Sequence, residues 1–160
     1  MAYLITFRTY GTWLHGDVRG SHDHRHNVFG GAKAPDNIIR EQQNVTKLKS
    51  EPFALQSRAR GIVEASIRSV CDYRNWHLHA LNVRSNHAHV VAAAGAVKPD
   101  PILRDFKAYA TRDLRKAGLW PHEHSPWSDG GSTRYLWKED SVWYACNYVL
   151  NSQGDDLPEF

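Results

Sequence analysis

The segment from 76 to 94 constrains the fold of this chain more than any other. WHLHALNV (76–83) and HAHVVAAA (87–94) each have the composition of a β-strand, and only the polar tripeptide RSN separates them. Two such runs joined by so short a turn predict an antiparallel hairpin. The middle of the chain is therefore expected to be β-structure.

Strands and helices are predicted on both sides of this hairpin. YLITFRTY (3–10) has strand character, and an apolar spacing of three and four predicts helices over about 52–74 and 101–116. PWSDGGSTRYLW (126–137) predicts a short strand, a Gly-Gly turn and a second strand, and an acidic start predicts a last helix over about 139–152. The order predicts one α+β domain over 1–160, with a ferredoxin-like, split β-α-β antiparallel sheet, helices packed on it and a C-terminal helix.

A polar segment from 14 to 51 interrupts this pattern. It is rich in Gly, His, Asn and Pro and is long for a loop, so we expect a functional insertion. His22, His24 and His26 alternate within it, but in this composition a solvated loop explains them better than a metal site. The tail 154–160 is expected to be loose.

Bulk composition limits the partners and the compartment. A net charge of +3 and a sequence pI near 8.9 permit a phosphate-rich partner. No apolar run is long enough to span a membrane, and the N-terminus does not have the pattern of a signal peptide. Cys71 and Cys146 fall in predicted helices and are expected to be reduced core thiols. Together these features predict a cytoplasmic protein with no membrane partner.

His87 and His89 begin the second strand of the hairpin. Side chains alternate along a strand, so both imidazoles should lie on one face, as two half-buried histidines or as two ligands of a metal. His77 and His79 have the same spacing on the first strand. On spacing alone the two pairs are equal candidates.

The chain resembles the HUH single-tyrosine transposases, which act on single-stranded DNA and include relatives associated with repetitive extragenic palindromes (REP). The segments that carry the resemblance extend from about residue 3 to about 157: FRTYGTWLHGD, NHAHVV, FKAYATRDLR, GGSTRYLW and YVLNSQGDDL. In this family two histidines and a third polar ligand from the tyrosine-bearing helix hold Mg²⁺ or Mn²⁺. The tyrosine attacks a phosphodiester and forms a 5′-phosphotyrosine, leaving a free 3′ hydroxyl.

The resemblance implies roles for particular residues. The family pair follows an asparagine, as His87 does, which favours His87 and His89 as metal ligands over the pair on the first strand; Ala88 stands between them, where a bulky residue is usual. Tyr148 is the expected nucleophile because a polar residue follows it by about one turn.

The third ligand is left open between two residues. Gln153 is the preferred candidate because a glutamine matches the family better in residue type, although the chain must turn at the end of the helix to bring its side chain to the site. Asn151 is second, favoured by ideal helical spacing from Tyr148. Tyr144, one turn earlier, is expected to be an aromatic that packs on the sheet.

Several basic and aromatic residues are candidates for contacts with single-stranded or hairpin DNA. The basic candidates are Arg8, Arg84, Lys107, Arg112, Arg134 and Lys138. Trp13, Trp127 and Trp137 are candidates for stacking on exposed bases. Family members often dimerise, so a homodimer is one expected form.

The expected function is a metal-dependent endonuclease and strand transferase on single-stranded DNA. One alternative is a domesticated, non-catalytic nucleic-acid-binding protein on the same fold. Another is a histidine-metal hydrolase that uses water, whose cleavage would not depend on any tyrosine.

Overall fold

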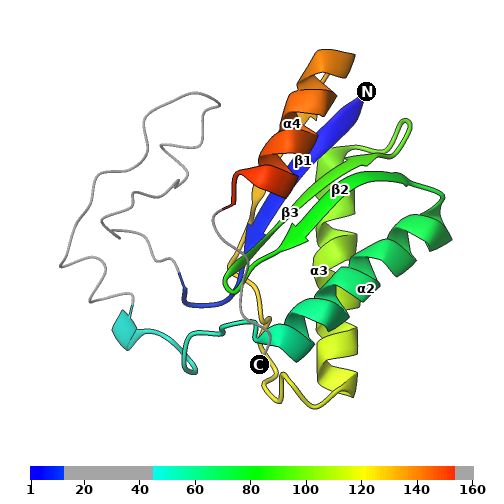
Figure 1. Ribbon diagram of the computed structural model, residues 1–160. Coiled ribbons are helices and arrows are strands. Elements are labelled where there is room, and N and C mark those ends of the chain that lie inside the picture. Colours follow the sequence, from blue (N-terminus) through cyan, green and yellow to red (C-terminus); the bar gives the residue numbers. More distant parts are fainter. Residues whose placement is uncertain (13–44, 154–160) are drawn as a thin grey trace.

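A computed structural model of the chain describes residues 1–12 and 45–153. A four-stranded antiparallel sheet in the order β2-β3-β1-β4 forms its centre (Figure 1). The elements are β1 (Ala2–Arg8), α2 (Ser57–Arg74), β2 (His77–Val83), β3 (His87–Ala93), α3 (Pro99–Lys116), β4 (Ser132–Leu136) and α4 (Glu139–Asn151). This is the ferredoxin-like β-α-β-β-α-β order with one further helix, so the predicted fold class is confirmed.

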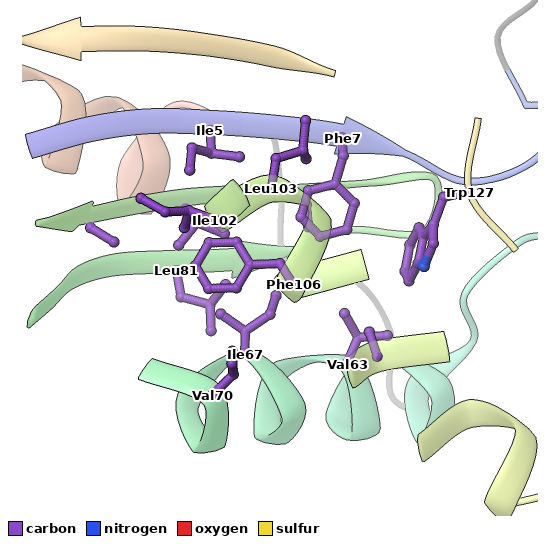
Figure 2. Close-up of a cluster of buried hydrophobic side chains, with 14 of the residues drawn as sticks. Ile5, Phe7, Val63, Ile67, Val70, Leu81, Ile102, Leu103, Phe106 and Trp127 are labelled. Atoms are coloured by element: carbon purple, nitrogen blue, oxygen red, sulfur yellow. The ribbon is translucent and has the colours of Figure 1, made fainter. Parts of the chain in front are cut away.

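Helices α2 and α3 cover one face of the sheet. Alternate residues of β1, namely Tyr3, Ile5 and Phe7, point toward them and are almost completely buried. Figure 2 shows Ile67 of α2 and Phe106 of α3 facing the strands, with Trp127 at one end of this cluster. The apolar spacing predicted from the sequence therefore forms the main core.

Helix α4 lies on the opposite face of the sheet, apart from α2 and α3 (Figure 1). A smaller buried cluster joins it to the strands, and it includes Val91 of β3 with Ala145 and Val149 of α4. Asn82 of β2 donates a hydrogen bond to the Val149 carbonyl at 2.9 Å. The C-terminal half of α4 is thereby held against the hairpin.

The first helix begins later than predicted, at Ser57 rather than Pro52. The Phe53 amide donates to the Tyr10 carbonyl and the Leu55 amide to the Ser85 carbonyl, at 2.8 and 2.6 Å. These bonds hold the segment in an extended conformation between β1 and the hairpin turn. Phe53, expected on the helix, packs instead against Trp120 with ring centroids 4.7 Å apart.

The hairpin predicted for 126–137 is only half correct. β4 forms over its second part, whereas the first part contributes one isolated bridge, Thr9 to Trp127, in place of a strand. The indole of Trp127 is buried and donates to the Lys107 carbonyl at 3.1 Å, which anchors the segment on α3.

Some predictions concern residues outside the part of the chain that the structure describes. These are most of the 14–51 loop, with His22, His24, His26 and Trp13, and the tail 154–160. Within residues 1–12 and 45–153, none of the helices has the length and apolar character needed to cross a membrane.

Candidate functional site

His87 and His89 lie on the face of the sheet that α4 covers. β3 runs between β1 and β2, so His89 is in register with Thr6 on one side and with Asn82 on the other. His87 is in register with Arg8. Ala88 points the other way into the main core and is completely buried. Strand alternation therefore places both imidazoles on one face, as expected.

The two rings contact each other, with centroids 4.6 Å apart and planes at 74°. Nδ1 of His87 lies 2.6 Å from Asn86 Oδ1, and Nδ1 of His89 lies 2.6 Å from Thr6 Oγ1. An amide oxygen can only accept, so Nδ1 of His87 carries the proton and its Nε2 keeps a lone pair. The Thr6 hydroxyl can hold His89 in the same tautomer. Such hydrogen bonds are how proteins orient histidine ligands.

Burial keeps both imidazoles uncharged at neutral pH. The pKa of His89 is lowered to about 4, chiefly by desolvation and then by the charges of His87 and Arg8. The pKa of His87 is lowered by desolvation, by Arg8 and by Arg84, whereas a side-chain hydrogen bond with Gln153 raises it. A neutral imidazole has the lone pair that a metal ligand needs.

Tyr148 is the tyrosine that the fold brings to this pair. Its ring centroid lies 5.6 Å from that of His89, and its side chain is 45% exposed. Tyr144, one turn earlier, is 66% exposed and contacts the ring of Trp143 at 5.1 Å, so the expectation that it packs on the sheet is wrong. A tyrosine half open to solvent beside a buried histidine is accessible to a large substrate.

The end of α4 separates the two candidates for a third ligand. The helix stops at Asn151, and Ser152 has non-helical angles, which turns Gln153 back so that its Nε2 donates to the Tyr148 carbonyl at 3.1 Å. The Gln153 side chain is also within hydrogen-bonding reach of His87 and His89. Asn151 instead donates to Asn147 Oδ1 at 2.7 Å on the exposed side of the helix.

No cluster of three or more His, Cys, Asp or Glu side chains suited to a metal exists within residues 1–12 and 45–153. Among the described residues, Gln153 is an amide whose side chain reaches both His87 and His89. Imidazole nitrogens with a side-chain amide oxygen form a donor set that suits Mn²⁺, and the oxygen also suits Mg²⁺.

The basic candidates divide between the two faces of the sheet. The charge of Arg8 acts on both histidines and that of Arg84 acts on His87. Arg134 is in register with Leu4 of β1, whose side chain packs into the cluster under α4, so Arg134 belongs to the same face. Lys138 is the residue that precedes the first turn of α4. Of these four, Arg8 and Arg84 are the ones whose charges act on the histidines, and Lys138 lies ten residues before Tyr148 along α4.

Lys107 and Arg112 belong to α3, on the opposite face, and the expectation that they lie near the histidines is wrong. The Lys107 ammonium donates to the carbonyls of Ser128, at 2.7 Å, and of Gly130. Arg112 pairs with Asp113 at 2.9 Å and lies over the ring of Tyr109. The Lys107 ammonium thus holds the 128–130 loop on α3. That Lys107 or Arg112 contacts DNA stays a prediction.

The remaining aromatic and histidine candidates lie in different parts of the fold. Trp127 is buried in the core, so the prediction that its indole stacks on DNA bases is wrong. Trp137 is 70% exposed and stacks on Tyr135, with ring centroids 5.1 Å apart. His77 is in register with Ala93 and Ala80 with Val91, so the levels of His77 and His79 lie roughly 7–13 Å along β3 from His89. The first-strand pair does not join this site.

Thr6 is a site residue that the sequence interpretation missed. A signal was available, because Tyr3, Ile5 and Phe7 alternate with Leu4, Thr6 and Arg8 along β1. Thr6, in the second set, therefore lies on the face of the sheet opposite the main core. Which strand pairs with β3, and in what register, was needed to place it beside His89.

No protein-family model matches the chain, and no curated protein matches it. Solved structures do resemble it. A REP-associated tyrosine transposase bound to a REP hairpin superposes with a TM-score of 0.53 at 11% identity, over 92% of this chain and 63% of that chain. A candidate transposase from Deinococcus radiodurans R1 gives a TM-score of 0.48 at 13% identity, over 97% and 92% of the two chains. At such identities the likeness is one of fold, and this chain spans less than two thirds of the first protein.

Proposed function

We propose that the chain is a metal-dependent endonuclease and strand transferase on single-stranded DNA, with Tyr148 as its nucleophile. One observation carries the proposal: the Tyr148 ring lies 5.6 Å from His89, while Gln153 reaches both imidazoles from the end of the same helix. A tyrosine nucleophile, two imidazoles and an amide then share one face. This is the set of groups that a covalent DNA-nicking reaction requires.

The proposed metal ligands are Nε2 of His87, Nε2 of His89 and the amide oxygen of Gln153. The Nδ1 contacts to Asn86 and Thr6 orient the rings so that both Nε2 atoms are available. Mg²⁺ or Mn²⁺ bound there would supply positive charge to the non-bridging oxygens of a phosphate.

The proposed reaction transfers a phosphoryl group from DNA to the protein. Tyr148 Oη forms a bond to phosphorus and gives up its proton, while the bond from phosphorus to the 3′ oxygen breaks and that oxygen takes up a proton. The 5′ phosphate stays linked to Tyr148, so the reverse reaction can rejoin the strand without ATP. Arg8 and Arg84 supply positive charge for the neighbouring phosphates.

Hairpin-forming single strands are the proposed substrate class. The REP-associated tyrosine transposase of similar fold holds a REP hairpin, and the half-exposed Tyr148 is open to an unpaired strand beside such a stem. Unpaired DNA is also the form in which a phosphodiester is most accessible to a side chain on a sheet surface.

The test is covalent capture of DNA. The chain is incubated with a labelled pool of hairpin-bearing single strands and Mn²⁺, and adducts are separated by denaturing electrophoresis. The wild type and Tyr144→Phe should form the adduct, whereas Tyr148→Phe should bind the same DNA without forming it. An adduct in Tyr148→Phe would identify another nucleophile. Binding without any adduct would favour the non-catalytic binder, and metal-dependent cutting in both tyrosine variants without an adduct would favour a hydrolase.

A further inference from the structure

A second pair of histidines lies on β2, outside the site described above. The ring centroids of His77 and His79 are 4.4 Å apart and their planes meet at 75°. The corresponding values for His87 and His89 are 4.6 Å and 74°. Two His-x-His segments on neighbouring strands therefore hold their imidazoles in the same mutual arrangement. Among the described residues, a ring contact with a tyrosine is recorded for His89, with Tyr148.

A β-bulge contributes to this arrangement. His77 is in register with Ala93, and the register shifts between Leu78 and Ala80 so that His79 has no partner on β3. A bulge turns the side chain of its extra residue away from regular alternation. Leu78, between the two histidines, packs against the main core and fixes the backbone from which both rings extend.

The surroundings of this pair are open. β2 is an edge strand, with β3 as its only neighbour in the described sheet, and both histidines are exposed. The remaining coordination positions of a bound ion would thus be filled by water. His89 has contacts with Thr6 and Gln153. Among the recorded interactions of the described residues, His77 and His79 have no comparable contacts.

The chemistry of the pair selects a class of ion. Imidazole alone suits Ni²⁺, Cu²⁺ and Zn²⁺, whereas Mg²⁺ requires oxygen ligands. Desolvation, then His77 and then the N-terminal amino group lower the pKa of His79, so this ring is neutral and has a lone pair at pH 7. The pair spans the levels of Ala93 to Val91, roughly 7–13 Å along β3 from His89, so an ion held by it would be separate from the first site.

We infer that His77 and His79 form a second metal site, which takes a transition-metal ion of the Zn²⁺ and Ni²⁺ class through two ring nitrogens. The inference rests on the geometry of the pair and does not depend on the proposed DNA chemistry. It assigns the chain two sites of different preference, one suited to Mg²⁺ or Mn²⁺ and one to ions that favour nitrogen.

Calorimetric titration of the full chain with Zn²⁺ alone tests the inference, with three variants compared under the same conditions. His77→Ala/His79→Ala should lose one equivalent of bound Zn²⁺ relative to the wild type. His87→Ala/His89→Ala should retain that equivalent, and histidines elsewhere contribute equally to every variant. Single His79→Asn, which leaves one imidazole in place, should weaken the same equivalent at least tenfold.

Folding of each variant is checked by its thermal unfolding midpoint, which should not change in the His77 and His79 variants because both of these side chains are exposed. In wild-type crystals soaked in Zn²⁺, an anomalous-difference peak should lie between His77 and His79. The inference would be overturned if His77→Ala/His79→Ala and His79→Asn both bound Zn²⁺ with the same number of equivalents and the same affinity as the wild type. The absence of the anomalous-difference peak would also overturn it.

Discussion

The ring of Tyr148, on the last helix, lies 5.6 Å from the ring of His89, on the central hairpin. The hydrogen bond from Asn82 to the Val149 carbonyl, at 2.9 Å, holds the two elements together at this level. The half-exposed phenol is thereby placed over a buried imidazole, and the end of α4 turns Gln153 toward the same point.

Gln153 and Asn151 should differ in their effect on metal dependence. Gln153→Ala removes the amide that reaches the histidines, so the Mn²⁺ concentration for half-maximal adduct formation should rise roughly tenfold or more. Asn151→Ala removes an exposed amide that contacts Asn147, and it should leave this concentration within a factor of two or so. Equal effects of the two substitutions would contradict the assignment of the third ligand.

Stability of the metal-free chain should fall with acid because of His89. Its pKa is about 4 in the fold and is near 6.5 in an unfolded chain, so between these values the unfolded state binds more protons. The free energy of unfolding should therefore decrease as pH falls through that window, by on the order of 1–2 kcal/mol between pH 7 and pH 5.

Urea denaturation in EDTA at the two pH values provides the measurement. His89→Asn should show a clearly smaller decrease than the wild type, although His87, whose pKa is also lowered, contributes in both. The same pH dependence in the wild type and in His89→Asn would mean that another group is responsible.

The sequence predicted the order of most helices and strands along the chain and the shared face of His87 and His89, because local apolar spacing and strand alternation determine both. It could not choose between Gln153 and Asn151, since the choice depends on where α4 ends and how Ser152 turns the chain. It also could not assign Lys107, because the Ser128 and Gly130 carbonyls reach it only after the loop folds onto α3. Contacts that cross between elements were the part that sequence reasoning missed.

Substitutions of Arg8 and of Arg112 should show which face of the sheet binds DNA. Arg8 lies beside the histidines, so Arg8→Ala should weaken binding of single strands and reduce the slope of log affinity against log salt by about 0.7. Arg112→Ala, on α3 and paired with Asp113, should leave the slope unchanged. Binding isotherms at four or five salt concentrations measure both, and a loss of slope in the Arg112 variant alone would place the DNA on the opposite face.

Lys107 should act on stability rather than on DNA. Lys107→Met leaves the Ser128 and Gly130 carbonyls without their donor, which should lower the free energy of unfolding by about 1–3 kcal/mol. Arg104→Met, at an exposed position of the same helix, should change it by less than about 0.5 kcal/mol. Chemical denaturation of both variants is the measurement. Unchanged stability of Lys107→Met together with weakened DNA binding would restore Lys107 as a DNA contact.

Two glycine substitutions should shift stability in opposite directions. A Cβ at Gly131 would lie 2.9 Å from the Thr6 carbonyl oxygen and 2.9 Å from Leu103 Cδ2. The carbonyl belongs to a central strand and cannot give way cheaply, so Gly131→Ala should lower the free energy of unfolding by about 1–3 kcal/mol. Gly61, inside α2, has no atom within 4 Å of the added carbon, so Gly61→Ala should raise it by roughly 0.5–1 kcal/mol.

Urea unfolding curves of the two variants, recorded beside the wild type, give both signs in one experiment. Gly61→Ala is the matched control, because it adds the same methyl group where there is open space. Thr6 also holds His89, so adduct formation should decrease in Gly131→Ala and stay constant in Gly61→Ala. If Gly131→Ala is as stable as the wild type, the backbone at Gly131 does not approach the Thr6 carbonyl as closely as the structure has it.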